Sequence, residues 1–421
     1  MKAHLSALIA LSAAGCASAQ DLAATPDAPA CTLVIAGGAL SADNEPVWRA
    51  FLDAAKPEGP LVIVPAASGA ASSSSGAVRN TLVRYGADVS RIKVAELAVL
   101  DDTSTPDIDE ASWAANANTP QTADLLSTAA AIWFTGGDQS RIADLLGTRD
   151  APRNGLQAVD QACGAGAPIG GTSAGAAIMS HPMLTGGSTL AALSGETDPD
   201  AGALTMGSGL GFFPHGLVDQ HFGERARLGR LTLATLRQDN SSRALGFGVD
   251  ENTAMIVNAD SELKVLGAGN VTIVNASGAD ASNVAPETPI SLKGVMLHVL
   301  GSGDTFNALD GRVTPSPGRT STLGAEYISR PIPDAAGVAA PYFTLSTLLG
   351  EGLLDNSVST VLSRTSFDDE GRAVRYRFTQ SEASEGYWGE GANGNSGYTI
   401  TNVGFDIAPA RVVIEAETPV E

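Results

Sequence analysis

The stretch APIGGTSAGAAIMS, residues 167–180, decides how the rest of the chain is interpreted. Its first residues, 167–170, predict the end of a buried strand, and AGAAIMS predicts the start of a helix. Between them, Gly171-Thr172-Ser173-Ala174-Gly175 matches the G-x-S-x-G pattern, in which a serine occupies a sharp strand-to-helix turn. The stretch therefore predicts an α/β fold with Ser173 as a nucleophile, although an ordinary tight turn fits the same five residues.

The N-terminal half repeats this alternation of strand and helix. Apolar runs at Leu33–Ala36, Leu61–Val64 and Ala130–Phe134 are typical of strands buried on both faces. Amphipathic patterns at 76–86, 121–130 and 139–149 predict helices between them. The alternation predicts a parallel sheet flanked by helices, with its chemistry beyond the carboxyl ends of the strands.

The C-terminal half has a different pattern. Short β-rich pieces separated by Gly, Asp and Asn turns run through 246–310 and predict additional antiparallel strands that complete the same domain. We expect this domain to span residues 31–312 and the Pro/Ser/Gly-rich segment 314–324 to be a linker. Residues 313–421 then form a C-terminal region of unknown role, with one helical stretch at Tyr342–Leu354.

The N-terminus has the pattern of an export signal. Lys2 and His4 precede an apolar stretch, and Ala17-Ser18-Ala19 fits a cleavage site, so we expect a signal peptide at 1–19, a linker at 20–30 and a secreted or periplasmic protein. Lipoprotein processing at Cys16 is the alternative. In an oxidising compartment, Cys31 and Cys163 could form a disulfide or remain two separate buried thiols.

Composition and charge limit the classes of partner. The 25 Lys and Arg residues against 46 Asp and Glu residues give a formal net charge of −21, which argues against nucleic acid as a ligand. This acidity is compatible with a cationic substrate, but it could equally serve solubility. Outside the N-terminus, no apolar run is long enough to cross a bilayer, so we expect no integral membrane span.

A serine nucleophile needs a base, and His221 is the best candidate among five histidines. It lies in Asp219-Gln220-His221-Phe222, before a helix that we expect at 223–237. The alternatives are His215 as the base and a mechanism without histidine. The carboxylate that orients the base should follow another strand end. Glu251 fits this place after the apolar run GFGV, with Asp250 as the alternative.

Two further groups are predicted from the same logic. The N–H of Ala174 would face the oxyanion from the start of its helix, and a second donor is expected from Thr135-Gly136-Gly137-Asp138. Arg227 and Arg230 are three residues apart on the expected helix, a spacing that suits the capture of carboxylates. A solvated charged helix is the alternative.

Four segments together resemble the cyanophycinase family. They are FTGGDQSRI (134–142), GGTSAGAAIMS (170–180), DQHFGERARLGRL (219–231) and GFGVDENTA (246–254). The resemblance covers roughly residues 31–310, and the signal peptide and long C-terminal region are similar to the extracellular branch of the family. It implies a flavodoxin-like fold related to class I glutamine amidotransferases, a homodimer, and no metal or other cofactor.

The resemblance also implies an activity and a site. The activity is exo-type hydrolysis of cyanophycin, an aspartate polymer with an arginine on each side chain, to β-aspartyl-arginine. Carried over by motif, the catalytic residues are Ser173, His221 and Glu251. Backbone N–H groups of Gly137 and Ala174 form the oxyanion hole. The substrate pocket comprises Gln139, Asp219, Gln220, Arg227 and Arg230. Alternatives are an aspartyl dipeptidase on small peptides, an inactive secreted polymer-binding protein, or a structural envelope domain.

Overall fold

The structure is a computed structural model that describes residues 30–238, 244–285, 287–368 and 371–413. The expected signal peptide, the lipoprotein site at Cys16 and all of the expected linker except residue 30 lie outside these ranges.

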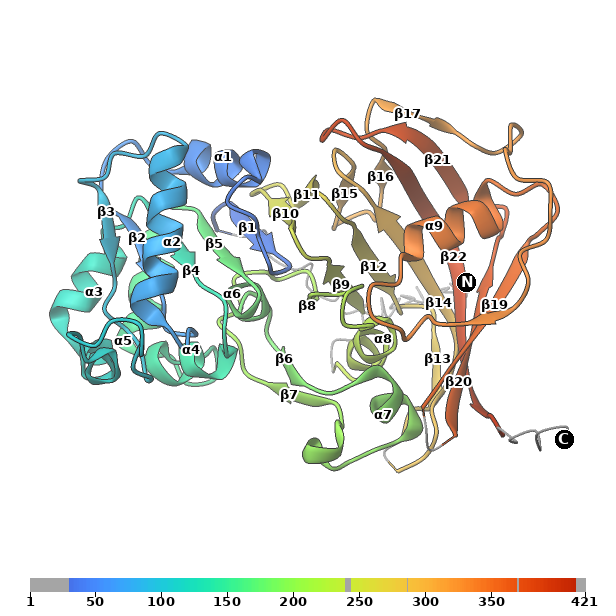
Figure 1. Cartoon of the computed structure of the whole chain (residues 1–421), viewed down its shortest axis with the longest axis horizontal. Coiled ribbons are helices and arrows are strands. Elements are labelled where there is room, and N and C mark those ends of the chain that lie inside the picture. The colour runs from blue at the N-terminus through green and yellow to red at the C-terminus, as the bar shows by residue number, and fades with distance from the viewer. Residues whose placement is uncertain (1–29, 239–243, 286, 369–370, 414–421) are drawn as a thin grey trace, which may run out of the picture.

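A nine-stranded sheet forms the N-terminal part of the molecule (Figure 1). The alternating pattern predicted parallel strands, and these run in the order β3-β2-β4-β5-β1. They are β1 (Leu33–Ala36), β2 (Leu61–Val64), β3 (Ile92–Val94), β4 (Ala131–Phe134) and β5 (Ile169–Thr172). The sheet continues beyond β1 with antiparallel β10 (Thr253–Val257), β11 (Glu262–Gly267), β15 (Thr305–Asn307) and β16 (Val313–Thr314).

Helices cover both faces of the parallel strands, which confirms the predicted layer arrangement. One face packs against α1 (Glu45–Ala54) and α2 (Ala71–Arg84), and there the ring of Trp133 lies 4.6 Å from that of Trp48. The other face packs against α3 (Pro120–Ser127), α4 (Gln139–Leu146), α5 (Asn154–Gly164) and α6 (Ala174–Ala177), with the 3₁₀ helix η1 (Glu110–Asn118) beside them.

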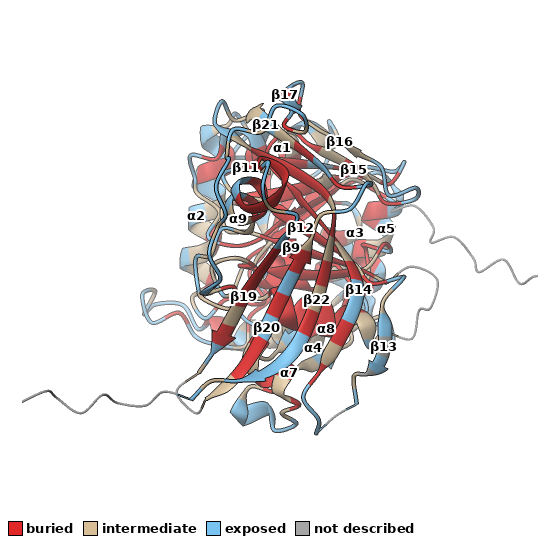
Figure 2. Cartoon of the chain, turned by 90° about the vertical axis from the view of Figure 1, so that its right-hand side faces the viewer, coloured by how far each residue is buried: buried red, intermediate tan, exposed pale blue. Residues whose placement is uncertain are grey.

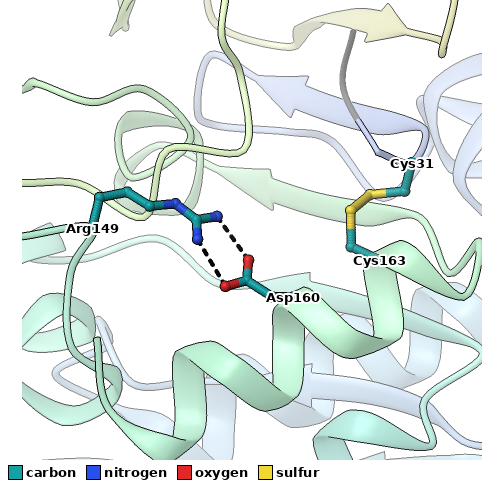
Figure 3. The surroundings of a disulfide bond; sticks show 4 residues. All are labelled: Cys31, Arg149, Asp160 and Cys163. Atoms are coloured by element: carbon teal, nitrogen blue, oxygen red, sulfur yellow. Dashed lines mark hydrogen bonds and ion pairs between the residues drawn. A yellow bond between two sulfur atoms is a disulfide. The ribbon is translucent and has the colours of Figure 1, made fainter. Parts of the chain in front are cut away.

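The two cysteines that the sequence left as paired or separate form a disulfide (Figure 3). It joins Cys31, two residues before β1, to Cys163 in α5, 132 residues further along the chain. In the same region, Arg149 donates two hydrogen bonds of 2.7 Å to the carboxylate of Asp160 on α5. Helix α5 is therefore fixed to the central strand of the sheet by a covalent bond and to a preceding loop by a bidentate ion pair.

A second, eleven-stranded sheet forms the right-hand part of Figure 1. Its main path is β18-β19-β20-β22-β14-β12-β9-β8. These strands are β8 (Leu217–Gln220), β9 (Leu245–Val249), β12 (Val271–Asn275), β14 (Ser291–Leu300), β18 (Ala335–Ala336), β19 (Val361–Phe367), β20 (Arg372–Thr379) and β22 (Ser396–Arg411); β13 (Asp280–Asn283), β17 (Gly318–Ser321) and β21 (Glu385–Glu390) pair at its margins.

The second sheet has its own core. One face packs on α7 (Thr189–Ser194), α8 (Leu228–Leu236) and α9 (Leu345–Leu349), while buried and exposed residues alternate along β20 (Figure 2). The expected helix at Tyr342–Leu354 is shorter, because α9 is followed by a π-helical turn, Gly350–Leu354. Between α6 and β8 in the chain, β6 (Met183–Gly186) pairs with β7 (Thr205–Gly207), and the 3₁₀ turn Pro199–Ala201 precedes β7.

The expected boundary at residue 312 separates strands that pair with each other. Strand β16, directly after it, pairs with β15 of the first sheet, and β22 pairs with β14 of the second. The expected linker at 314–324 is wrong, because it contains β17, which pairs with β21. There the buried Arg319 donates to Asp304 and to Thr399, so its charge ties the segment into the core.

No helix among the described ranges is long and apolar enough to cross a membrane.

Candidate active site

Ser173 lies at the turn between β5 and α6, where the sequence placed it. Its backbone has φ 56° and ψ −110°, a conformation that is rare for a residue with a side chain. The flanking glycines have a steric reason: a Cβ on Gly171 would lie 2.4 Å from the carbonyl oxygen of Gly175, and one on Gly175 would lie 2.5 Å from that of Phe134. The turn thus requires a small residue two positions before and after the serine.

Three predicted residues meet in one hydrogen-bonded chain. Ser173 Oγ lies 2.8 Å from His221 Nε2, and His221 Nδ1 lies 2.6 Å from Glu251 Oε1. Ser173 comes from the first sheet, whereas His221 and Glu251 follow the neighbouring parallel strands β8 and β9 of the second. In the tautomer with a proton on Nδ1, the imidazole donates to Glu251 and accepts from the Ser173 hydroxyl.

The ring of His221 is held from the first sheet as well. Its backbone has φ 46°, and its N–H donates to the carbonyl of Gly37 at 2.6 Å. The ring packs so closely on Gly38 that a Cβ there would lie 2.2 Å from Cε1 of the imidazole. The sequence signal for this contact is the pair Gly37-Gly38 directly after Leu33–Ala36.

The helix expected at 223–237 begins later, at Leu228. His221 and Ala226 both have left-handed φ values, 46° and 53°, and these interrupt any helix before α8. Glu224 and Arg225 therefore lie in a turn rather than on a helix face. Arg227 is the N-cap residue of α8 and Arg230 lies in its first turn, and both side chains reach Asp219, so the two arginines lie on one side as expected although Arg227 only flanks the helix.

Burial is the main influence on the titration of His221. The side chain is 9% exposed, and this burial lowers its pKa below the ordinary value by disfavouring the imidazolium. The hydrogen bond that the imidazole donates to Glu251 raises the pKa, and the charge of Arg225 again lowers it. The net effect keeps the imidazole neutral and able to accept a proton near neutral pH.

Asp219, Arg227 and Arg230 form a buried ion cluster beside His221. Arg230 donates from Nε and Nη2 to the two oxygens of Asp219, at 2.8 and 2.6 Å, and from Nη1 to the carbonyl of Gly187 at 2.6 Å. Arg227 donates to Asp219 at 3.2 Å. Burial would raise the pKa of Asp219, but the charges and hydrogen bonds of both arginines outweigh it and hold the pKa below its usual value.

The two predicted glutamines are engaged with the chain itself. Gln220 Oε1 accepts a hydrogen bond of 2.8 Å from Arg227, whose pKa burial lowers to about 10. Gln139 Nε2 donates to the carbonyl of Leu184 on β6 at 3.1 Å. Both side chains are thus oriented by neighbours around the Ser173–His221 pair.

The loop after β4 approaches the serine. A Cβ on Gly136 would lie 3.3 Å from Cβ of Ser173, so the backbone of Gly136 and Gly137 passes close to the nucleophile. Within the described ranges, the N–H groups of Gly137 and Ala174 donate to no other protein group. Both donors are therefore available to a ligand at Ser173.

Asp250, the alternative orienter, does not bind the imidazole. Its Oδ1 accepts from the N–H of Gly223 at 2.9 Å, and its Oδ2 accepts from the N–H of Asn270 at 3.0 Å. The sequence offered no signal for these contacts, because Asn270 lies twenty residues further along the chain. Glu251 is therefore the carboxylate next to His221.

Known proteins resemble this chain over part of its length. The cyanophycinase of Geminocystis herdmanii (strain PCC 6308) is 41% identical over 181 residues, which are 42% of this chain and 62% of that protein. The cyanophycinase of Trichormus variabilis is 37% identical over 201 residues, 47% of this chain and 63% of its own length. The matches thus span less than two thirds of these relatives.

Among solved structures, a peptidase from an acI-B1 Actinobacterium matches with a TM-score of 0.44 and 19% identity, over 66% of this chain and 96% of that one. The model of peptidase family S51 matches residues 32–265, which is more than half of the chain and includes Ser173, His221 and Glu251. This chain therefore belongs to peptidase family S51.

Proposed function

We propose that this chain is a serine peptidase that hydrolyses cyanophycin to β-aspartyl-arginine, with Ser173 as nucleophile, His221 as base and Glu251 as the orienting carboxylate. The observation that carries the proposal is the chain of two hydrogen bonds, 2.8 and 2.6 Å, that begins at a serine in a left-handed turn. The match of residues 32–265 to family S51 and the similarity of part of the chain to cyanophycinases support the reaction and the polymer.

In the first half of the reaction, neutral His221 takes the proton of the Ser173 hydroxyl while Oγ attacks the carbonyl carbon of the scissile amide. The oxyanion that forms accepts hydrogen bonds from the N–H groups of Gly137 and Ala174. Each such donor contributes about 3 kcal/mol to stabilising the transition state. The imidazolium then gives its proton to the leaving amine, and the C–N bond breaks to leave an ester on Ser173.

In the second half, His221 takes a proton from a water molecule, whose oxygen attacks the ester carbonyl. The collapse of this intermediate breaks the bond to Oγ, and His221 returns the proton to Ser173. Glu251 accepts from Nδ1–H throughout, which keeps the tautomer and stabilises each imidazolium. The reaction consumes one water and one amide bond, and the enzyme is regenerated.

The charged groups near His221 suit a substrate with both guanidinium and carboxylate groups. Arg225 is exposed next to the imidazole, whereas Arg230 and Asp219 are bound to each other. We therefore propose that Asp219 and Arg230 hold Gln220 and Arg227 in position. Gln220 and Arg227, together with Gln139, then contact the substrate. Cyanophycin offers a guanidinium and a free carboxylate on every unit, which matches such mixed recognition.

The decisive experiment compares the purified protein with its Ser173→Ala variant on insoluble cyanophycin, with dipeptide release measured by mass spectrometry. We expect turnover to fall by about a million-fold in the variant, because the nucleophile is lost. Ser277→Ala, which changes an exposed serine, is the matched control and should keep wild-type activity. Unchanged dipeptide release by Ser173→Ala would refute the assignment, and cleavage of aspartyl dipeptides with no release from the polymer would favour the dipeptidase alternative.

We further propose that the protein is exported and that its N-terminus is removed near Ala19, because residues 1–19 have the pattern of a signal peptide. N-terminal sequencing of the mature protein tests this: a start near Gln20 is expected, and an intact Met1 would contradict it. Native mass measurement of the same sample tests the proposed homodimer.

A further inference from the structure

The turns that carry His221 and Glu251 are fastened to each other by two carboxylates. Asp250, next to Glu251, accepts a hydrogen bond of 2.9 Å from the N–H of Gly223 in the His221 turn. In return, Glu224 of the His221 turn accepts one of 3.1 Å from the N–H of Glu251. Each turn thus supplies one acceptor side chain and one donor N–H to the other.

Asp250 also connects this arrangement to a third segment. Its second oxygen accepts from the N–H of Asn270, the residue before β12, at 3.0 Å. Because β12 pairs with β9, the carboxylate fixes the turn after β9 to the adjacent strand of the same sheet. The position of the turn is therefore defined by both oxygens of one side chain.

The Glu251–His221 contact depends on this geometry. The left-handed backbone of His221 and the close contact of its ring with Gly38 leave the imidazole little freedom on the side of the first sheet. On the other side, the distance between Nδ1 and Glu251 is set by how the two turns lie relative to each other. A small displacement between them would lengthen the 2.6 Å hydrogen bond.

The C-terminal region covers the same arrangement. Val338, Phe343 and Leu345 line the same pocket as Phe222, Gly223 and Asp250. The carbonyl oxygen of Phe343 would lie 3.3 Å from a Cβ on Gly223, so the two segments are in direct contact. Removal from water and repulsion by Glu224 raise the pKa of Asp250 to about 6.

We propose that Asp250 and Glu224 are positioning residues that hold the His221 turn against the Glu251 turn, with residues 338–346 shielding their hydrogen bonds from water. The inference rests on the proposed function, since it concerns the same His221–Glu251 pair. It also gives a role to the C-terminal region, which the sequence left unexplained.

The first test is kinetic. Asp250→Asn keeps the size of the side chain but replaces one of its two acceptor oxygens with an NH₂ group. That group cannot accept a hydrogen bond, so one of the two backbone N–H groups loses its partner. We expect kcat on cyanophycin to fall by about 100-fold with KM changed less than about twofold, because substrate contacts are not altered. Glu224→Ala should show the same split, and Glu224→Gln, which keeps an acceptor oxygen, should restore most of the activity. Asp53→Asn, an exposed carboxylate on α1, is the matched control.

The second test does not require turnover. In the Ser173→Ala background, the Nδ1 proton between His221 and Glu251 should give a far-downfield NMR resonance at neutral pH. Adding Glu224→Ala or Asp250→Asn should move this resonance toward the ordinary imidazole range, whereas adding Glu224→Gln should leave it in place. Urea denaturation verifies that each variant is folded, and Glu224→Ala, in a partly exposed residue, keeps the test open if Asp250→Asn does not fold.

The two proposals can fail separately. Wild-type kcat together with an unmoved resonance in both Asp250→Asn and Glu224→Ala would overturn the positioning role. Absence of any peptidase activity in the wild-type protein would instead overturn the proposed function, while the resonance would still report whether these carboxylates position the imidazole.

Discussion

The turn that presents Ser173 and the turns that present His221 and Glu251 differ in what determines their shape. Around Ser173, the determinants are local. Gly171 and Gly175 lie two residues from Ser173, and a Cβ at either position would collide with backbone atoms. Around His221, the determinants are distant in sequence. Gly37 and Gly38 come from the first sheet, Asp250 and Glu251 from the end of β9, and Phe343 from the C-terminal region.

This difference has a consequence for how each half of the site responds to change. A local turn depends on the identity of a few neighbouring residues and forms with its own strand and helix. A pair held by contacts from both sheets depends on the packing of the whole chain. Substitutions of Asp250 or Glu224 should therefore reduce catalysis without unfolding the protein. Substitutions of Gly171 or Gly175 should instead destabilise the fold.

Among variants that keep both Ser173 and His221, Glu251→Gln should have the largest effect, and it tests how the base is oriented. Glu251→Gln keeps the size of the side chain but removes the charge that stabilises the imidazolium and can select the wrong tautomer. We expect kcat to fall by about ten thousand-fold with little change in the free energy of unfolding. Steady-state kinetics and urea denaturation check the two parts. A loss of activity smaller than tenfold would show that the orienting contact is not needed.

The next effect concerns the buried ion cluster behind the base. Asp219→Asn leaves the guanidinium groups of Arg227 and Arg230 buried without a counter-charge, so we expect a loss of about 3–5 kcal/mol in the free energy of unfolding. The midpoint of urea denaturation measures this loss. The control Asp53→Asn should change stability by less than about 0.5 kcal/mol. A midpoint equal to wild type would mean that the cluster does not stabilise the fold.

The sequence predicted the parts of the molecule that depend on local pattern. Continuous apolar runs predicted β1, β2, β4 and β5, with β1 and β2 at their observed bounds, because a strand buried on both faces needs such a run. The parallel strand β3 was missed, because only one of its three residues is buried. The position of Ser173 followed from two glycines and a strand-to-helix switch. His221 and Glu251 could be chosen because few histidines exist and because a carboxylate followed a strand end.

The sequence could not predict what depends on contacts between distant segments. The helix expected from residue 223 fails because His221 and Ala226 take left-handed conformations that local propensity does not indicate. The segment 314–324 has the composition of a linker, yet Arg319 is buried by Asp304 and Thr399, which lie on other parts of the chain. The roles of Gly38 and Asp250 likewise depend on contacts between distant segments. Gly38 contacts the imidazole ring of His221, and Asp250 accepts hydrogen bonds from backbone N–H groups.

A smaller effect tests the local turn. In Gly175→Ala the new Cβ would lie 2.5 Å from the carbonyl oxygen of Phe134 and 2.9 Å from its Cβ, and neither atom belongs to a flexible end. We expect a loss of about 1–3 kcal/mol in the free energy of unfolding, with weaker fluorophosphonate labelling of Ser173. Gly76→Ala is the matched control: nothing lies within 4 Å of a Cβ there, and alanine should stabilise α2 by up to about 1 kcal/mol. Equal stability of both variants would contradict the steric explanation.

The smallest effect is a shift in the pH dependence of kcat/KM. It tests whether the charge of an exposed arginine changes the pKa of His221. Burial lowers the pKa of His221, so the neutral form persists to lower pH than in a solvated histidine, and kcat/KM should decline only below pH 6.5, by about tenfold per pH unit. The charge of Arg225 contributes to this lowering, and therefore Arg225→Gln should raise the pKa and move the acid limb to higher pH. Because Arg225 is exposed, added salt should reduce the difference between the two profiles. An acid limb that stays in place in Arg225→Gln would mean that the arginine's charge does not act on His221, and that burial alone lowers the pKa of the imidazole.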